Sequence, residues 1–341
     1  MRTSDLDYDL PVEAIAQTPV EPRDTARLLV DRGDAAAPVH QYVRDLPDLL
    51  EPGDLVVVND TRVLPARLAL RRASGGAVEV LLLERHDGDG RSWSALVRPS
   101  RKLRDGEVVT SADGTLRVVI GGRADDDGVR AVELDTEGDP LAAIERHGLV
   151  PLPPYITTPL GDPGRYQTVY AARSASAAAP TAGLHLTVGV LDALVARGIG
   201  LARVELVVGL DTFRPITVDD LAAHRMHTEA YRVDPAVLER CAAAKAAGGR
   251  VVAVGTTSVR ALESAAARGP TGRTDLFIRR PYEFRVVDVL LTNFHLPRTT
   301  LLAMIDAFVG ARWRSLYDTA LAADYRFLSF GDAMLLQRAD R

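Results

Sequence analysis

The chain contains a single cysteine, Cys241, among its 341 residues. One thiol can form neither an internal disulfide nor a cysteine-based zinc site, so the sequence excludes a disulfide scaffold and a zinc ribbon. A continuous apolar run of about 18 residues, which a membrane-spanning helix needs, is also missing. The residues after Met1 lead into acidic residues rather than an apolar signal core. We therefore expect a cytoplasmic protein with no membrane association.

Lysine is almost absent as well, because only Lys102 and Lys245 stand among the 41 basic residues. Neither follows a glycine and precedes a serine or threonine, so the phosphate-binding P-loop is excluded. The dinucleotide fingerprint Gly-x-Gly-x-x-Gly and the hydrolase elbow Gly-x-Ser-x-Gly do not occur. His224 and His227 could supply two metal ligands, but the sequence shows no matching third, and we expect no metal.

The remaining composition is that of an ordinary folded protein, with 47% hydrophobic and 26% charged residues and a length that favours two domains. Apolar runs followed by helical patterns recur in residues 1–68 and 151–341, which is typical of an α/β domain. Residues 69–150 hold short β-rich runs between glycine and aspartate clusters, which favours an inserted antiparallel barrel or sandwich. The proline-rich stretch 151–154 marks the exit as an extended linker.

Four polar segments stand where ligands collect in α/β proteins, at the carboxyl ends of strands or in a loop of small residues. They are residues 59–67, 179–185, 255–260 and 292–297. The first crowds Asn59, Asp60, Thr61 and Arg62 after an apolar run. Buried hydrogen-bonding groups need partners, which a ligand could supply, although a capped turn with surface ion pairs explains the same residues.

The other three segments carry different chemistry. In residues 255–260, a glycine turn precedes hydroxyl side chains at a predicted helix start, where an anion could bind or the hydroxyls could simply cap the helix. Residues 292–297 contain Phe294 and His295, a stacking group and a proton-transfer group, although a lone histidine is more often structural. The loop 179–185 combines Gly183, which permits close backbone approach, with His185.

Together these segments resemble one known family. The shared motifs occur in one order along the chain, at residues 7–11, 22–24, 59–67, 179–185 (Ala-Pro-Thr-Ala-Gly-Leu-His), 226–229, 255–260 (Gly-Thr-Thr-Ser-Val-Arg), 292–297 (Thr-Asn-Phe-His-Leu-Pro) and 325–334. From about residue 5 to 336, the sequence closely resembles the S-adenosylmethionine:tRNA ribosyltransferase-isomerase family of the queuosine pathway. The resemblance implies a barrel-like mixed α/β main domain, here 1–68 and 151–341, with a small antiparallel β-barrel domain inserted at 69–150.

The resemblance also implies a reaction in which S-adenosylmethionine donates its ribosyl carbons rather than its methyl group. The acceptor is the aminomethyl group of 7-aminomethyl-7-deazaguanine in the anticodon region of a tRNA. Adenine and methionine leave, and epoxyqueuosine remains in the tRNA. S-adenosylmethionine is a co-substrate in this scheme, which requires no metal, no separate cofactor and no obligate protein partner.

This chemistry needs a base beside the sulfonium, a donor that assists adenine departure, and polar groups for the methionine carboxylate and ammonium. His185 and His295 are our candidates for the proton transfers. Candidates for the carboxylate are Thr256, Thr257 and Ser258, and candidates for the acceptor base or the ribose are Asn59, Asp60 and Arg62. The remaining substrate-binding candidates are Thr61, Thr181, Gly183, Gly255, Asn293 and Phe294.

RNA binding must be local, because the formal net charge of the chain is −5 and RNA is a polyanion. We expect a basic patch on the inserted domain together with two arginines near residue 280. The candidates are Arg98, Arg101, Lys102, Arg104, Arg279 and Arg280.

One segment departs from the family pattern Leu-His-Val-Gly-x-Gly-Thr-Phe, because residues 206–213 read Leu-Val-Val-Gly-Leu-Asp-Thr-Phe. Val207 and Asp211 stand in place of the usual histidine and second glycine. Either that imidazole is not essential, or the chain acts on a related acceptor. Two alternatives therefore stay open: S-adenosylmethionine-dependent ribosyl transfer to a small molecule, and a noncatalytic RNA-binding protein of the same fold.

Overall fold

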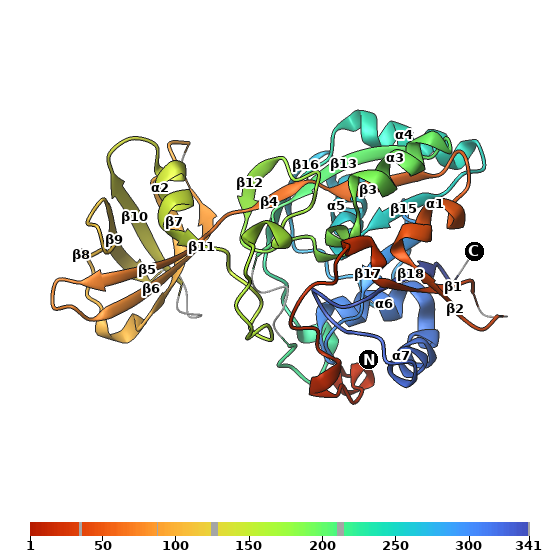
Figure 1. Ribbon diagram of the computed structural model, residues 1–341, viewed down its shortest axis with the longest axis horizontal. Helices are drawn as coiled ribbons and strands as arrows, with labels where there is room; N and C mark the ends of the chain where they lie inside the picture. Colours follow the sequence, from red (N-terminus) through yellow and green to blue (C-terminus); the bar gives the residue numbers. More distant parts are fainter. Residues whose placement is uncertain (34–35, 87, 124–128, 210–214, 340–341) are drawn as a thin grey trace. The chain divides into compact units, whose positions relative to one another are not determined.

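The computed structural model describes residues 1–33, 36–86, 88–123, 129–209 and 215–339 (Figure 1). The chain divides into two compact units. The first comprises Met1–Thr61, Pro153–Arg173 and Ala179–Arg341, and the second comprises Arg62–Leu152 and Ser174–Ala178. The sequence placed the insertion at 69–150, whereas the chain passes into the second unit already at Arg62, within the short strand β4 (Thr61–Val63) that pairs with β12 (Arg173–Ser176).

The first unit is built on a nine-stranded mixed sheet with the order β16-β14-β13-β3-β15-β17-β18-β1-β2. Its strands are β1 (Arg27–Asp31), β2 (Val39–Tyr42), β3 (Leu55–Asn59), β13 (Gly200–Leu206), β14 (Glu229–Arg232), β15 (Val251–Val254), β16 (Thr271–Thr274), β17 (Val289–Asn293) and β18 (Ala333–Gln337). The neighbours β13, β3, β15 and β17 run parallel, while β18 is antiparallel to β17. Among the described strands, β16 and β2 form the two edges of this sheet.

Helices cover the sheet because its central strands are apolar on both faces. Strands β3, β15 and β17 are buried at every residue, which explains why they read as continuous apolar runs. The helices of this unit are α1 (Leu46–Leu49), α3 (Val188–Ala196), α4 (Pro235–Ala246), α5 (Thr256–Arg268), α6 (Thr300–Val309) and α7 (Trp313–Ala322). On one face, Leu46 of α1 and Leu194 of α3 join Val56 and Val252 of the sheet in a single buried cluster.

The second unit is a closed antiparallel barrel. Its strands are β5 (Arg67–Arg72), β6 (Ala77–Arg85), β7 (Ser92–Arg98), β8 (Glu107–Thr110), β9 (Leu116–Arg123) and β10 (Val129–Thr136). They follow the order β5-β6-β7-β10-β9-β8, and β8 pairs back with β5 to close the ring. Strand β7 alternates buried and part-exposed residues, with Trp93, Ala95 and Val97 inside, as a barrel wall requires. Helix α2 (Pro140–His147) and the short strand β11 (Gly148–Leu149) complete the unit.

The predicted class, an α/β protein with an inserted antiparallel barrel, is therefore confirmed. The open choice between barrel and sandwich is decided by the pairing of β5 with β8. In the described ranges, no helix is both long enough and apolar enough to cross a membrane.

Candidate active site

A pocket opens in the first unit at the carboxyl ends of β15 and β17, the edge where parallel strands present the loops that follow them. It is lined by Tyr155, Val208, Thr299, Leu301 and residues 179–182, 255–257, 292–296 and 328–329. The polar segments that the sequence singled out around residues 181, 256 and 294 thus meet in one place, although they are far apart in the chain.

The start of α5 forms one wall of this pocket. Gly255, which joins β15 to α5, has a φ of 85°, a left-handed conformation that favours glycine. Thr256 and Thr257 follow it and line the pocket, where the first N–H groups of a helix lack intrahelical partners. The Thr257 side chain is buried, and its Oγ1 has no hydrogen-bond partner among the described residues. Ser258 differs, because its Oγ donates to the Val254 carbonyl oxygen at 2.7 Å and is occupied within the helix.

Asn293, the last residue of β17, connects two other segments. Its Oδ1 accepts a hydrogen bond from Thr181 Oγ1 at 3.0 Å, and its Nδ2 lies 2.9 Å from Nε2 of His185. The same Nδ2 donates to the carbonyl oxygen of Asp332 at 3.3 Å. Asn293 and Thr181 line the pocket, but His185 does not, since it stands behind Asn293 in the buried interior. Burial lowers the pKa of His185 to about 4, with Arg23 as a secondary cause.

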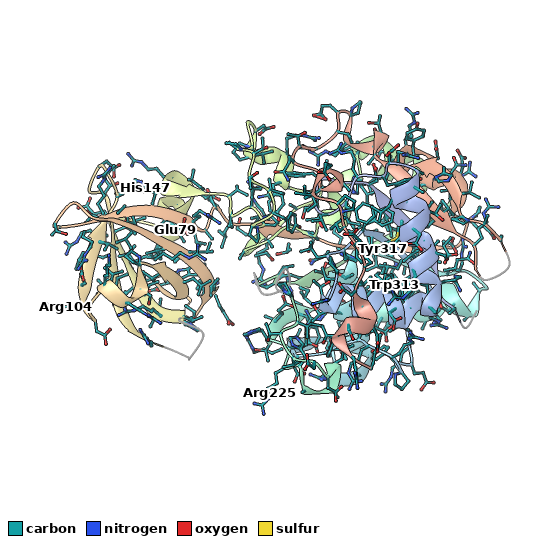
Figure 2. All side chains as sticks on the ribbon, turned by 90° about the horizontal axis from the view of Figure 1, so that it is seen from below. Glu79, Arg104, His147, Arg225, Trp313 and Tyr317 are labelled. Atoms are coloured by element: carbon teal, nitrogen blue, oxygen red, sulfur yellow. The ribbon has the colours of Figure 1, made fainter. Side chains whose placement is uncertain are left out.

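His295 lines the pocket directly. Its Nε2 lies 2.9 Å from Thr292 Oγ1. The backbone is held on both sides, because its N–H donates to Tyr317 Oη at 3.0 Å and its carbonyl oxygen accepts from Tyr8 Oη at 2.6 Å. Tyr317 lies in the first unit beside Trp313 in the side-chain view (Figure 2). Burial lowers the pKa of His295 to about 3, so the imidazole is neutral at pH 7.

Two further candidates take packing roles. Gly183 is needed because a Cβ at this position would lie 2.0 Å from Tyr170 Oη, so the close approach that glycine permits is to a tyrosine. Phe294 borders the pocket, yet it is fully buried and its ring stacks on Phe327 with centroids 4.5 Å apart. Little of this aromatic surface remains for a ligand.

The segment after β3 does not join the pocket. Asn59 is fully buried, and its amide bonds the backbone of β13, with Nδ2 donating to the Leu206 carbonyl oxygen at 3.0 Å. Asp60 faces a separate polar cleft that includes Arg203 and Arg232, and burial raises the pKa of its carboxyl. Thr61 is buried. Arg62 is exposed and belongs to the second unit.

The segment that departs from the family pattern borders the same pocket. Val208 lines it, whereas the N–H of the preceding Val207 pairs with the Ala230 carbonyl oxygen at 2.9 Å. The next residue, Gly209, donates its N–H to Glu229 Oε1 at 3.0 Å, and Glu229 forms a buried ion pair with Arg260 of α5. The ion pair therefore links the end of β13 to the helix that forms the pocket wall. Asp211 lies outside the described residues.

Sequence reasoning missed several lining residues. Tyr155 Oη and Ser329 Oγ are 2.6 Å apart, and burial raises the pKa of Tyr155 to about 12. Leu328 has a φ of 71°, which is rare for a branched side chain and places residues 328–329 against the pocket. The signals were present, since Tyr155 follows the proline-rich linker and residues 325–334 form a shared motif. Neither feature indicated which side chains would face a ligand.

The basic candidates form two groups, which differ in whether the cation contacts another side chain. On the second unit, Arg98, Arg101, Lys102 and Arg104 are exposed, and none forms a salt bridge within the part of the chain that the structure describes. Figure 2 shows Arg104 at the surface of the barrel.

The two arginines near residue 280 belong to the first unit and are engaged there. Arg280 makes a bidentate pair with Asp306 at 2.6 Å from both its Nε and Nη2. The guanidinium of Arg279 lies 5.9 Å from the ring centroid of Phe277. In the described residues, no group of three histidine, cysteine, aspartate or glutamate side chains is placed to hold a metal ion.

The structure thus defines a class: an α/β protein with a pocket at the carboxyl ends of its parallel strands and an inserted barrel with exposed basic residues. The family is defined by sequence, since the family model described as "Queuosine biosynthesis protein" matches residues 3–336. The chain belongs to this family, as its motifs predicted.

Relatives support this assignment over their full length. The chain is 51% identical over 343 residues to the S-adenosylmethionine:tRNA ribosyltransferase-isomerase of Symbiobacterium thermophilum, covering 98% of this chain and 100% of that one. It is 52% identical over 348 residues to the enzyme of the same name from Anaeromyxobacter sp. strain K, covering 99% and 100%. A crystal structure of S-adenosylmethionine tRNA ribosyltransferase from Thermotoga maritima matches 97% of this chain and 99% of its own, with 36% identity and a TM-score of 0.55.

Proposed function

We propose that this chain is an S-adenosylmethionine:tRNA ribosyltransferase-isomerase in queuosine biosynthesis. The observation that carries the proposal is identity of about half the residues, over essentially the whole chain, to enzymes that bear this name. The reaction transfers and isomerises the ribosyl group of S-adenosylmethionine onto the aminomethyl group of 7-aminomethyl-7-deazaguanine in tRNA. Adenine and methionine are released, and epoxyqueuosine is formed in the tRNA.

The pocket at β15 and β17 is the proposed site for S-adenosylmethionine. The free N–H groups and positive dipole end of α5 suit the methionine carboxylate, and the unpartnered Thr257 Oγ1 adds a hydroxyl donor beside them. Thr256 lines the same wall. Ser258 is a weaker candidate than the sequence suggested, because its hydroxyl is already bonded to Val254.

His295 is the proposed proton acceptor. A base must enter the reaction unprotonated, and the His295 imidazole is neutral at pH 7. Because burial also lowers its pKa and so weakens it as a base, the proposal rests on its position in the pocket. The two tyrosine contacts to its backbone and the Thr292 hydroxyl near Nε2 fix the ring against the pocket. The low pKa also means that the protonated form is costly, so the proton has to pass onward quickly to a leaving group or to solvent.

The tRNA is proposed to contact the second unit through Arg98, Arg101, Lys102 and Arg104. Four exposed cations that form no salt bridge in the described residues can exchange counterions for RNA phosphates, which gives affinity without base reading. Arg280 is less suited, since Asp306 already neutralises it. We further propose that the anticodon region of the tRNA is bound, that the reaction proceeds without a metal or separate cofactor, and that the protein is cytoplasmic.

The test is to incubate the protein with S-adenosylmethionine and tRNA that carries the deazaguanine precursor. Chromatography should show adenine and methionine released in step with nucleoside conversion. Methylated tRNA together with S-adenosylhomocysteine would refute the proposed chemistry. Adenine release that does not depend on tRNA would indicate a small-molecule acceptor, and no release under any condition would indicate a noncatalytic RNA-binding protein.

A further inference from the structure

The hydrogen bonds around Asn293 have a fixed direction. The backbone carbonyl oxygen of Asp332 can only accept, so the amide atom 3.3 Å from it must be Nδ2. This orientation follows from chemistry, although oxygen and nitrogen of an amide look alike in shape. The amide oxygen is then the atom that faces Thr181.

Two consequences follow for the partners of Asn293. His185 must accept at Nε2, because Nδ2 is a donor, so the imidazole is neutral with its proton on Nδ1. Thr181 must donate its single hydroxyl proton to Oδ1 at 3.0 Å. The Thr181 oxygen therefore offers only lone pairs to the pocket that it lines.

The loop that holds Thr181 also lies against the start of α5. A Cβ built at Gly255 would be 3.7 Å from the Ala182 Cβ and 3.6 Å from Thr257 Oγ1. A group that only accepts hydrogen bonds thus stands close to a helix end that favours anions. The hydrogen-bond acceptor suits the ammonium group of an α-amino acid, and the adjacent helix end suits its carboxylate.

From this arrangement, and resting on the proposed function, we infer that Thr181 binds the α-ammonium group of S-adenosylmethionine while the start of α5 binds its carboxylate. Asp332, Asn293 and His185 set the direction of the Thr181 hydroxyl. His185 is accordingly a positioning residue that acts through Asn293. The methionine end of the substrate lies at residues 181 and 255–257, which leaves the side formed by Tyr155 and residues 328–329 for the remainder of the molecule.

The test compares binding of S-adenosylmethionine with binding of its analogue in which hydrogen replaces the α-amino group. Wild-type protein should prefer the complete molecule by about 10- to 100-fold, the scale of a hydrogen bond to a charged group. Thr181→Val, which keeps the shape but removes the acceptor, should reduce this preference to about twofold, while Thr181→Ser should keep it. Because the preference is a ratio measured on one preparation, partial unfolding cancels.

Decarboxylated S-adenosylmethionine serves as the matched control ligand. It lacks the carboxylate but keeps the amino group, so Thr181→Val should prefer the complete molecule over it by the same factor as the wild type. A Thr181→Val protein that retains the full amino-group preference overturns the inference and leaves the proposed function intact. Wild-type protein that binds no S-adenosylmethionine refutes the proposed function instead.

The role of His185 has its own readout. His185→Leu removes the acceptor of Asn293 Nδ2 and should raise KM for S-adenosylmethionine by more than it lowers kcat, with weaker amino-group preference. His185→Gln, whose amide oxygen can accept from Nδ2, should restore the preference. A fall in kcat of about a hundredfold in both variants, with a changed pH profile at saturating substrate, would show instead that His185 transfers a proton.

Discussion

Two parallel strands of the sheet, β3 and β17, both end in a buried asparagine, and the structure uses them differently. Asn59 bonds to backbone groups, since its Nδ2 donates to the Leu206 carbonyl oxygen and its Oδ1 accepts from the N–H of Leu206 at 3.2 Å and of Thr61 at 3.2 Å. Asn293 bonds to one backbone group, the Asp332 carbonyl oxygen, and also to the side chains of Thr181 and His185. The first asparagine ties two strands together, whereas the second bonds to Thr181, which lines the pocket.

The difference shows that a polar strand end is not by itself a site. A polar strand end contributes to a site when its side chain bonds to other side chains that line a pocket. It does not when all its hydrogen bonds go to backbone atoms. At the end of β3, the Asn59 side chain forms its hydrogen bonds with backbone groups of the sheet. After β15, the buried Thr257 hydroxyl has no hydrogen-bond partner among the described residues.

Replacing His295 should have the largest effect. His295→Ala should lower turnover about a hundredfold or more, equivalent to ~2.7 kcal/mol, because it removes the proposed proton acceptor, while S-adenosylmethionine binding changes little. Single-turnover adenine release measures the change. Val207→His should not rescue this variant, since the Val207 N–H belongs to a strand pairing and its side chain does not line the pocket. Near-normal turnover in a folded His295→Ala protein would move the proton transfer to another group.

At the other strand end, Asn59→Ala should affect stability rather than chemistry. The substitution leaves buried backbone groups of Leu206 unpaired and should lower the free energy of unfolding by about 2 kcal/mol. Urea denaturation measures this loss. The kcat of the remaining folded protein should stay within about twofold of wild type. A large fall in kcat at unchanged stability would return the β3 end to the active site.

The two buried histidines predict an acid-sensitive stability. Their pKa values are lowered in the folded state, to about 4 for His185 and about 3 for His295, so the unfolded chain binds more protons below its ordinary histidine pKa of about 6.5. Stability is therefore fully present above pH 6.5 and falls as pH decreases toward 4. In His185→Gln, the slope of unfolding free energy against pH in this window should be shallower by up to ~1.4 kcal/mol per unit. An unchanged slope would mean that His185 is already protonated when folded.

The smallest predicted effects concern RNA. Neutral substitutions such as Arg101→Gln and Lys102→Gln should each weaken tRNA binding and reduce the slope of log affinity against log salt by up to about one unit. Arg280→Gln is the matched control, because its charge is paired with Asp306 and the slope should stay the same. Binding isotherms across salt concentrations distinguish the two groups. Equal slopes for the barrel variants and wild type would place the RNA surface elsewhere.

The sequence predicted the α/β class, the inserted antiparallel unit and four polar segments as a site, of which three line the pocket, because periodicity and strand-end chemistry are local properties. It could not distinguish Asn59 from Asn293, since both follow apolar runs and differ only in which neighbours the topology gives them. Tyr155 and Ser329 were missed for the same reason. They enter the pocket through pairing of the linker with a loop near the carboxyl end of the chain, which no spacing reveals.

Gly183 shows that a residue type can indicate a structural constraint without indicating its cause. Its lack of a side chain suggested close approach by a ligand, and the group that approaches is Tyr170 of the same chain. The requirement for glycine was readable from the sequence, but its cause was not. Similarly, the serine in residues 255–260 was grouped with its neighbours, although helix geometry turns Ser258 back onto Val254.

We claim that S-adenosylmethionine binds where β15 and β17 end and not where β3 ends. Calorimetric binding to two variants tests this. Thr257→Val should weaken binding about tenfold, ~1.4 kcal/mol, because it removes from the pocket wall a buried hydroxyl that has no partner among the described residues. Asp60→Asn should bind within about twofold of wild type, because Asp60 faces a different cleft. The reverse result, with affinity lost in Asp60→Asn and kept in Thr257→Val, would contradict the claim and place the substrate at β3.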